Sequence, residues 1–474
     1  MSENTFKRIF RNTAVLTGAR LFSRILQFFL FIYAARCLGV VNFGIFSFAY
    51  ALVRMLGLSM DLGMSYYTVQ QVSRDRKLTS AYLGASLRAK IFLILLGYGL
   101  IMGTGLMMEK DSLTLNVLFI LATVTAFDNL TMPFDSVFNA HEQMQYQAII
   151  ISVSNCLMSA IGFVFLYFYQ DLLLFCAANA IGAFLRMGMG SLWCMKLYGK
   201  PARNFDFSFI INLIKNGIPF SLVVIFVTIY YNIDSLILDR FCGSEAVGYY
   251  NAAYRLIEAP LFISSSLTTA LFPAISRLYK ENPAELKILI SESFHKGLAL
   301  GLSVALVTSF LSEELVALIY GQEYAPAARV LPILIFSVAF IMPGTICGTA
   351  IRATDRQSVS AVVAGGGAFL NILLNLIFVP RYASAGAAWS TLATEILVVA
   401  VYMELVRCSI GPVFRLIPLC RILALNALLL GFLHLSAFAG IWFQIVGCTL
   451  LFLPLCLLTG VVKTAELQKL FSKN

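Results

Sequence analysis

Apolar residues fill this chain in long runs that are separated by short polar stretches. A helix that crosses a bilayer needs about 20 apolar residues, and windows of that size predict fourteen such helices. Their predicted limits are 13–35, 41–64, 89–107, 113–135, 147–168, 172–195, 217–238, 247–273, 297–319, 328–350, 359–379, 385–406, 418–436 and 441–462. The longest connection, residues 196–216, is too short for a separate catalytic domain. The pattern therefore predicts an all-α integral membrane protein.

An internal repeat relates residues 36–50 to residues 240–254 at a constant offset of 204 positions. Arg36, Gly39, Gly44, Ala49 and Tyr50 recur unchanged, and the aromatic residue Phe46 corresponds to Tyr250. Because transporters are often built from two related halves, the repeat predicts two six-helix lobes in parallel orientation, followed by two extra helices. The predicted parts are an N-terminal lobe, a cytoplasmic linker, a C-terminal lobe, and two extra transmembrane helices with a cytoplasmic tail, over residues 1–195, 196–216, 217–406 and 407–474.

Composition supports the same class. Of 474 residues, 59% are hydrophobic and 12% are charged, against about 25% charged residues in an average soluble domain. That balance excludes a soluble enzyme and a disordered chain. The net charge of +10 comes from short basic clusters between apolar runs, which is typical of membrane topology signals, so no nucleic-acid partner is expected.

Basic residues alternate from loop to loop in a way that predicts orientation. With a cytoplasmic N-terminus, the inner segments hold 23 Lys and Arg residues and the outer segments hold 5. The outer ones are Arg36, Lys110, Arg240, Arg329 and Arg381. Since cytoplasmic loops keep the positive charge, we expect both termini in the cytoplasm. Losing or adding one helix would scramble this alternation, so the count also favours fourteen.

The ten cysteines form no Cys-x-x-Cys motif, and most lie within apolar runs. They are therefore interpreted as small hydrophobic residues rather than as a disulfide framework. A bridge between Cys37 and Cys242, near the ends of two related helices, stays open at this point.

Six basic residues fall within or at the edge of the predicted helices. An arginine in mid-bilayer costs at least about 2.5 kcal/mol, so such residues normally face protein or a water-filled cavity. Guanidinium groups bind phosphate oxygens in a planar, bidentate way, which suits an anionic head group. The predicted cationic cavity consists of Arg24, Arg54, Arg255, Arg20 and Arg186. Two alternatives are that Arg20 and Lys90 reach out to the inner interface, which is favoured for both, and that Arg186 pairs with an acid.

Acidic residues also lie within the predicted helices. A carboxylate there can bind a proton or Na⁺ while a cavity alternates, or it can simply pair with one of the arginines, and pairing is slightly favoured for any single acid. The candidates for ion coupling are Asp61, Asp128, Asp135, Asp234, Glu258 and Glu395. The three histidines show no metal-ligand spacing, and no nucleophile constellation or nucleotide-binding loop occurs, so neither an enzyme nor a bound cofactor is expected.

Two motifs resemble a known family. The run Arg36-Cys-Leu-Gly39-Val-Val-Asn-Phe-Gly44-Ile-Phe46 is similar to the start of the polysaccharide-biosynthesis flippases. The run from Val379 and Pro380 through Gly386-Ala-Ala to Glu395 is similar to their later signature. The family usually has Tyr-Gly after the Pro, where this chain has Tyr382-Ala383. With fourteen helices, the resemblance covers nearly the whole chain and extends to the multidrug/oligosaccharidyl-lipid/polysaccharide exporter superfamily.

The resemblance implies a flippase of the cytoplasmic membrane that works by alternating access. It would carry a lipid-linked oligosaccharide repeat unit, attached to polyprenyl pyrophosphate, to the outer leaflet for O-antigen, capsule or exopolysaccharide assembly. The implied partners are this substrate, membrane lipids and other polysaccharide assembly proteins, and the expected state is a monomer. One alternative is a cation-coupled drug or metabolite antiporter of the same superfamily. An integral-membrane glycosyltransferase or polymerase is less favoured, because it would need a sizeable outer loop.

Overall fold

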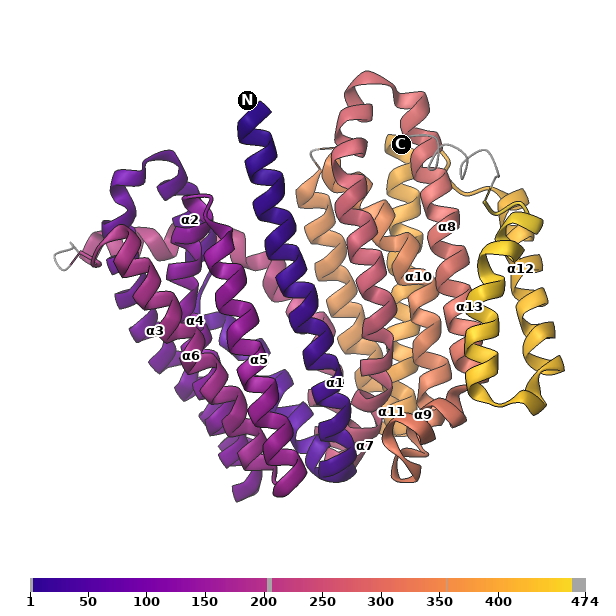
Figure 1. The fold of residues 1–474 in the computed structure, drawn as a ribbon, viewed down its shortest axis with the longest axis horizontal. Helices are drawn as coiled ribbons and strands as arrows, with labels where there is room; N and C mark the ends of the chain where they lie inside the picture. Colours follow the sequence, from indigo (N-terminus) through magenta and orange to yellow (C-terminus); the bar gives the residue numbers. More distant parts are fainter. Residues whose placement is uncertain (1–2, 203–206, 355, 463–474) are drawn as a thin grey trace. The chain divides into compact units, whose positions relative to one another are not determined.

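The computed structural model describes residues 3–202, 207–354 and 356–462, and these ranges contain helices and no strand. The chain divides into two compact units, unit 1 (Met1–Gly248) and unit 2 (Tyr249–Asn474), which Figure 1 colours from indigo to yellow along the sequence. The predicted tail after residue 462 and Arg203 of the predicted linker lie outside the described residues.

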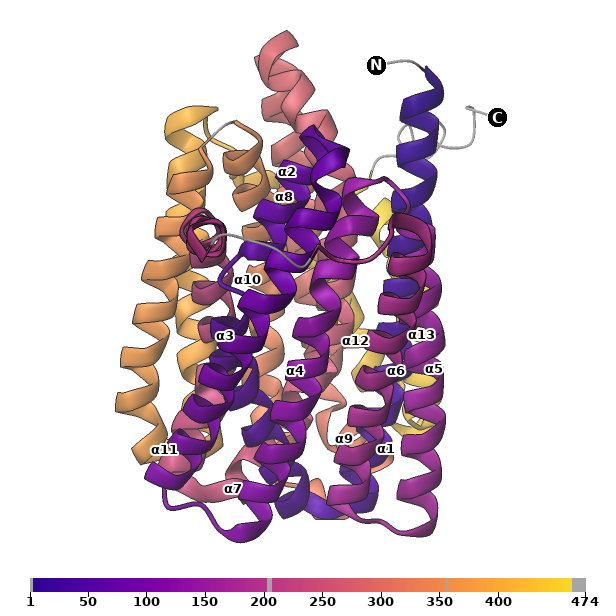
Figure 2. The same cartoon turned by 90° about the vertical axis from the view of Figure 1, so that its left-hand side faces the viewer.

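Unit 1 is a helix bundle in which α4 occupies a central place. Its elements are α1 (Glu3–Leu56), η1 (Gly57–Met60), α2 (Met64–Arg74), η2 (Arg76–Leu78), α3 (Thr79–Met107), α4 (Ser112–Ala140), α5 (Met144–Phe168), α6 (Leu172–Tyr198) and the first part of α7 (Phe207–Glu281). Helix α4 contacts α1, α2, α3, α5 and α6, and α5 packs on α1 and α6. Figure 2 shows α3 beside α4 and α5 beside α6.

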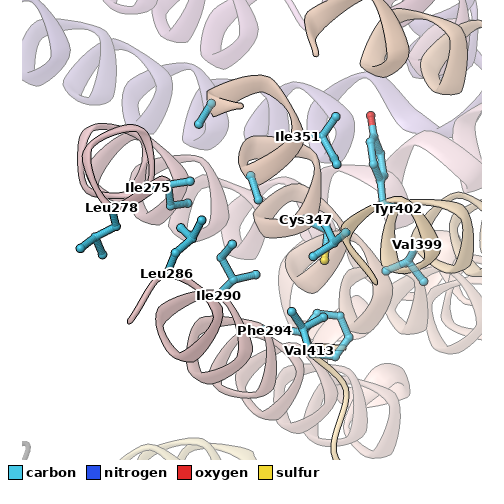
Figure 3. Close-up of a cluster of buried hydrophobic side chains, with 13 residues drawn as sticks. Ile275, Leu278, Leu286, Ile290, Phe294, Cys347, Ile351, Val399, Tyr402 and Val413 are labelled. Atoms are coloured by element: carbon cyan, nitrogen blue, oxygen red, sulfur yellow. The ribbon is translucent and has the colours of Figure 1, made fainter. Parts of the chain in front are cut away.

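Unit 2 is built around α10. After the second part of α7 come α8 (Pro283–Phe310), α9 (Ser312–Tyr320), η3 (Gln322–Tyr324), α10 (Ala327–Ala353), α11 (Gln357–Ser409), α12 (Leu416–Leu435), η4 (Ala437–Ala439) and α13 (Ile441–Leu458). Helix α10 packs between α8 and α11, and α12 packs on α8 and α13. Buried side chains of α7, α8, α10, α11 and Val413 form the apolar cluster of Figure 3.

The number of membrane-length segments confirms the predicted fourteen. Eleven helices among the described residues are long and apolar enough to cross a bilayer. Three of these, α1, α7 and α11, contain a non-helical residue that divides each into two segments. Counting those segments separately gives fourteen.

The breaks in α1 and α7 fall at equivalent positions of the internal repeat. Gly39 has φ 74° and ψ 171°, and Gly243, 204 positions later, has φ 80° and ψ 176°. A residue with a Cβ rarely adopts this backbone conformation, whereas glycine adopts it readily. The two repeat-related glycines therefore bend their helices in the same way. All ten cysteines are free thiols, including Cys37 and Cys242 beside these bends.

The third break, in α11, falls on a residue other than glycine. Ala383 has φ 49° and ψ −130°, a conformation that favours glycine, which the resembling family usually has at this point. Its Cβ strains the backbone there. The turn predicted after Pro380 is therefore present, although the residue that usually permits it is absent.

A second pair of repeat-related glycines makes reciprocal contacts in unit 1. A Cβ on Gly44 would overlap with the carbonyl oxygen of Ser244, and a Cβ on Gly248 would overlap with that of Val40. Subtracting 204 converts Gly248 to Gly44 and Ser244 to position 40. The two contacts are thus equivalent under the repeat, and each glycine lets one segment approach the backbone of the other.

Several predicted limits are wrong for physical reasons. The second predicted helix, 41–64, ends at Leu56 and continues as η1 before the chain breaks. The ninth, 297–319, begins at Pro283, because Asn282 caps α8 by accepting from the Glu285 N–H and Pro283 suits the first turn. The first turns of α8 are helical, but they are polar, so the apolar window did not include them. The second half of the predicted linker 196–216 belongs to α7, and the predicted lobe boundaries otherwise stay a prediction.

Segments predicted to be cytoplasmic meet at one end of unit 1. Hydrogen bonds join Asn12 to the Glu142 carbonyl (2.6 Å), Thr79 to His141 (2.9 Å) and Ser80 to the Lys200 carbonyl (2.9 Å). At the other end, Lys110 forms an ion pair with Asp239. The predicted alternation of loops is therefore present in this unit, while the side that faces the cytoplasm stays a prediction.

Replacing Gly44 or Gly248 by Ala should destabilise the protein by a similar amount in each case, about 1 to 3 kcal/mol, because the new methyl group overlaps with fixed backbone. The measurement is the midpoint of thermal unfolding in detergent. Gly99→Ala is the matched control, since a Cβ on this helical glycine of unit 1 meets nothing within 4 Å. Midpoints for the Gly44 and Gly248 variants no lower than that of the control would contradict the reciprocal contact.

Candidate functional site

The break after η1 places a carboxylate inside the helices of unit 1. Leu62 and Gly63 both have positive φ, 49° and 76°, so the chain turns before α2 begins at Met64. The Asp61 carboxylate accepts hydrogen bonds from Ser65 Oγ and from Lys90 Nζ, both at 2.5 Å. The polar group that interrupts the helix is therefore satisfied within the protein, as a low-dielectric surrounding requires.

Lys90 of α3 is the cation of this group, and its side chain is fully buried, with 0% exposure. An ammonium group has three donors. They point to Asp61 Oδ1 (2.5 Å), Asn129 Oδ1 (3.2 Å) and Met132 Sδ (3.8 Å). The favoured expectation that Lys90 reaches out to the inner interface is wrong, because all three donors have partners in the interior.

A second ionic cluster lies on an adjacent face of α4. Arg186, in the middle of α6, reaches Asp135 Oδ2 at 3.0 Å and Asp128 Oδ1 at 3.4 Å. The two carboxylates are seven residues apart and share one face of α4, as their spacing predicts. Arg186 thus adopts the alternative arrangement in which it pairs with acids.

Three polar atoms of this cluster are buried without a hydrogen-bond partner in the described part of the chain. They are Asp135 Oδ1, Gln147 Oε1 of α5 and Arg186 Nε. Arg20 of α1 is exposed and acts on Asp135 only through its charge. The ion pairs of the cluster join α4 to α6, and its acceptors Asp135 Oδ1 and Gln147 Oε1 retain unused hydrogen-bonding capacity.

Helix α4 connects the two clusters. One face presents Asp128 and Asp135 to α6. The adjoining face presents Asn129, Met132 and Ser136 to α2 and α3, where Ser136 Oγ donates to the Ser65 carbonyl at 3.1 Å. Between them lies Pro133, which has no N–H to donate to the Asn129 carbonyl. The helix is therefore weakened where it carries both charged groups, and a bend there would move both together.

The remaining predicted residues are divided between the units. In unit 1, Arg24 and Arg54 of α1 are exposed, and the Arg54 guanidinium lies 5.6 Å from the centre of the Tyr50 ring. Asp234 of the same unit is buried. In unit 2, Arg255 donates to both carboxylate oxygens of Glu258 at 3.1 Å, and Glu395 is buried. The substrate-binding and coupling roles of these residues stay predictions.

Sequence reasoning missed the neutral partners of the charged residues. Asn129, Met132 and Ser136 occur at spacings of three and four residues, which puts them on one helical face, and this spacing was the available signal. Gln147 gave no comparable signal.

Two family models and several named proteins are similar to this chain. A family model described as "Polysaccharide biosynthesis protein" matches residues 9–279, and a second, "MatE", matches residues 219–377. The "Capsular polysaccharide biosynthesis protein CapF" of Staphylococcus aureus is 24% identical over 65% of this chain and 76% of its own length. A "Putative O-antigen transporter" of Escherichia coli (strain K12) is 23% identical over 84% of this chain and 96% of its own.

Solved structures share the fold. The structure titled "Lipid II flippase MurJ, inward closed conformation" superposes with a TM-score of 0.80 over 96% of this chain and 99% of that chain, at 18% identity. An inward-facing multidrug resistance MATE family transporter gives a TM-score of 0.65 over 82% and 94%, at 12% identity.

If the buried pair positions α2, α3 and α4, removing one charge should cost more than removing both. We expect Lys90→Met and Asp61→Asn each to destabilise the protein by about 3 kcal/mol, because each leaves an uncompensated buried group, and the double variant to recover part of that loss. Denaturant unfolding in detergent measures the cycle. The exposed pair Arg407–Glu404 is the control, with a coupling below about 1 kcal/mol. Additive losses for Lys90 and Asp61 would contradict the prediction.

Proposed function

Because the chain belongs to the polysaccharide biosynthesis protein family, we propose that it is a flippase that moves a glycan linked to polyprenyl pyrophosphate from the inner to the outer leaflet of the cytoplasmic membrane. The observation that carries the proposal is the family match over residues 9–279, more than half of the chain. Relatives named for capsular polysaccharide biosynthesis and O-antigen transport, and a structural neighbour that flips lipid II, support the same class of cargo. The protein acts as a transporter, with both termini in the cytoplasm.

The head group is held by arginines in this proposal. Arg24 and Arg54 expose their guanidinium groups and have no ion pair with another described residue, so they can accept phosphate oxygens bidentately. In unit 2, Arg255 binds phosphate in the same way by exchanging Glu258 for it. Arg186 holds its two aspartates instead, and Arg20 contributes its charge to the same cluster. The substrate role thus narrows to Arg24, Arg54 and Arg255.

Ion coupling is assigned to the cluster on α4. Two carboxylates share one directly bonded guanidinium, which leaves one negative charge on the pair Asp128 and Asp135. In this conformation Arg20 of α1 supplies nearby positive charge. A proton or Na⁺ takes over this role when α1 moves away, so that binding of the ion favours one conformation over the other. The membrane potential adds about 2.3 kcal/mol per charge at 100 mV for an anionic head group that moves outward.

A second candidate is a cation-coupled drug or metabolite antiporter. The match of residues 219–377 to the MatE family model and the MATE structural neighbour favour it. Its substrate site would need acids that are available to a cationic drug, whereas Asp61, Asp128 and Asp135 all have basic partners. The flippase proposal is therefore the stronger one.

Arg24→Ala, Arg54→Ala and Arg255→Ala should each reduce polysaccharide export about tenfold or more, the cost of one charge-assisted hydrogen bond, while the protein reaches the membrane at its normal level. The assay uses the source cell, in which the gene for this protein is deleted and one variant at a time is expressed. In cells with an alanine variant, the lipid-linked glycan should accumulate in the inner leaflet. Lysine at these positions should rescue only partly, because it lacks the planar fork. Arg407→Ala, at an exposed helix end, is the control.

Normal export by all three alanine variants would overturn the cationic site. Efflux of cationic drugs by the native protein, with no movement of lipid-linked glycan, would favour the antiporter instead.

Asp128→Asn should weaken the response of transport to an ion gradient while leaving transport without a gradient largely intact, because the neutral side chain no longer exchanges a proton or Na⁺. Reconstituted vesicles, with flipping followed under an imposed pH or Na⁺ gradient, provide the measurement. Glu404→Gln removes an exposed acid and should leave the response unchanged. An unaltered gradient response in Asp128→Asn would exclude Asp128 as the coupling residue.

A further inference from the structure

Unit 2 contains a cavity of about 530 Å³ where α8 meets the first turn of α12 and the residues that follow α13. Its polar wall holds Glu292, His295 and Lys296 of α8, together with Arg415 and Arg421. Leu416, Ile417 and Ile422 form part of the apolar wall. This cavity involves none of the residues assigned to the transported substrate or to ion coupling.

The floor of the cavity is fixed by hydrogen bonds between α8 and the segment before α12. Ser291 Oγ donates to the Val413 carbonyl at 2.6 Å. His295 Nδ1 donates to the Ser291 carbonyl at 2.7 Å, and His295 Nε2 accepts from the Arg415 backbone N–H at 3.2 Å. Val413 also belongs to the apolar cluster drawn in Figure 3, next to Phe294 of α8. The backbone that carries Arg415 is therefore held in place.

Positive charge gathers at this point. Lys296, Arg415 and Arg421 face one acid, Glu292, so the lining has a net charge of about +2 when His295 is neutral. Arg421 donates to the Gly460 carbonyl at 3.0 Å, which keeps its guanidinium in the wall. No side chain caps the start of α12, so its first N–H groups add to the positive field. The chemistry selects an anion such as a phosphate group.

The surroundings select a lipid phosphate rather than a soluble one. Helix α12 is a membrane-length apolar helix whose first residues line the cavity. Leu416 and Ile417, directly beside Arg415, are 71% and 70% exposed, which provides apolar surface for acyl chains next to the charged groups. Basic pockets between transmembrane helices at a membrane surface are typical sites for anionic head groups.

We propose that this cavity binds the head group of an anionic membrane phospholipid, such as phosphatidylglycerol. Its phosphate lies among Lys296, Arg415 and Arg421, and its acyl chains follow the apolar start of α12. The lipid then links α8 to α12 and to the end of α13. It is a structural ligand of unit 2 rather than cargo.

Native mass spectrometry in detergent tests this assignment, with phosphatidylglycerol and phosphatidylcholine of equal chain length as probes. The native chain should bind phosphatidylglycerol about tenfold more tightly, and the double variant R415Q/R421Q should lose that preference. The control K280Q/R356Q removes two exposed charges of unit 2 that do not line the cavity. This control should keep the preference for phosphatidylglycerol. Size-exclusion profiles verify that both variants are folded.

Equal binding of the two lipids by the native chain, or an undiminished preference in R415Q/R421Q, would overturn the proposal. Two further probes separate the sources of phosphate. Displacement of phosphatidylglycerol only by a large excess of inorganic phosphate supports a lipid site. Stabilisation by millimolar inorganic phosphate with no lipid preference, or tighter binding of farnesyl pyrophosphate than of phosphatidylglycerol, would overturn it in favour of a free anion or of the transported lipid.

Discussion

The arrangement of unit 1 depends on the ion pair between Lys90 and Asp61. In a hydrocarbon surrounding, a charged carboxylate and a charged amine are each costly. Here the Asp61 carboxylate at the helix break and the Lys90 ammonium satisfy each other. A buried pair adds little net stability compared with apolar residues, but leaving one partner alone is expensive. The pair therefore selects one arrangement of α2, α3 and α4 over its alternatives. Because α4 also carries the aspartates that hold Arg186, this choice determines where the second cluster lies.

The two charged groups that contact α4, around Lys90 and around Arg186, differ in how many of their polar atoms have hydrogen-bond partners. Around Lys90 every donor has an acceptor, so that group is suited to holding structure. Around Arg186 three polar atoms, the acceptors Asp135 Oδ1 and Gln147 Oε1 and the donor Arg186 Nε, have no partner among the described residues, so that group is incompletely satisfied. The backbone hydrogen bond that Pro133 cannot donate is missing in the part of α4 that contacts both groups, so the helix bends more easily there.

The sequence was sufficient for the fold because the bilayer imposes a length on each apolar run, and the repeat revealed equivalent bends at Gly39 and Gly243. Hydropathy failed at Asp61, where a single charge ends a helix within an apolar stretch. It also failed at the start of α8, where polar turns are helical outside the membrane window. The prediction for Lys90 was wrong because the sequence does not show that Asp61 lies beside it, and its other two partners, Asn129 and Met132, carry no charge. Three-dimensional packing was needed to find them.

The contacts of Gly44 with Ser244 and of Gly248 with position 40 have an evolutionary consequence. Exchanging the two repeats converts one contact into the other, so the interaction has the reciprocity of a two-fold symmetric interface. A single ancestral repeat could have made the same contact with a second copy of itself, in the same membrane orientation. The contact therefore requires no invention after gene duplication. The same glycine and carbonyl positions of the repeat are therefore used twice, once in each copy, to form a single local contact.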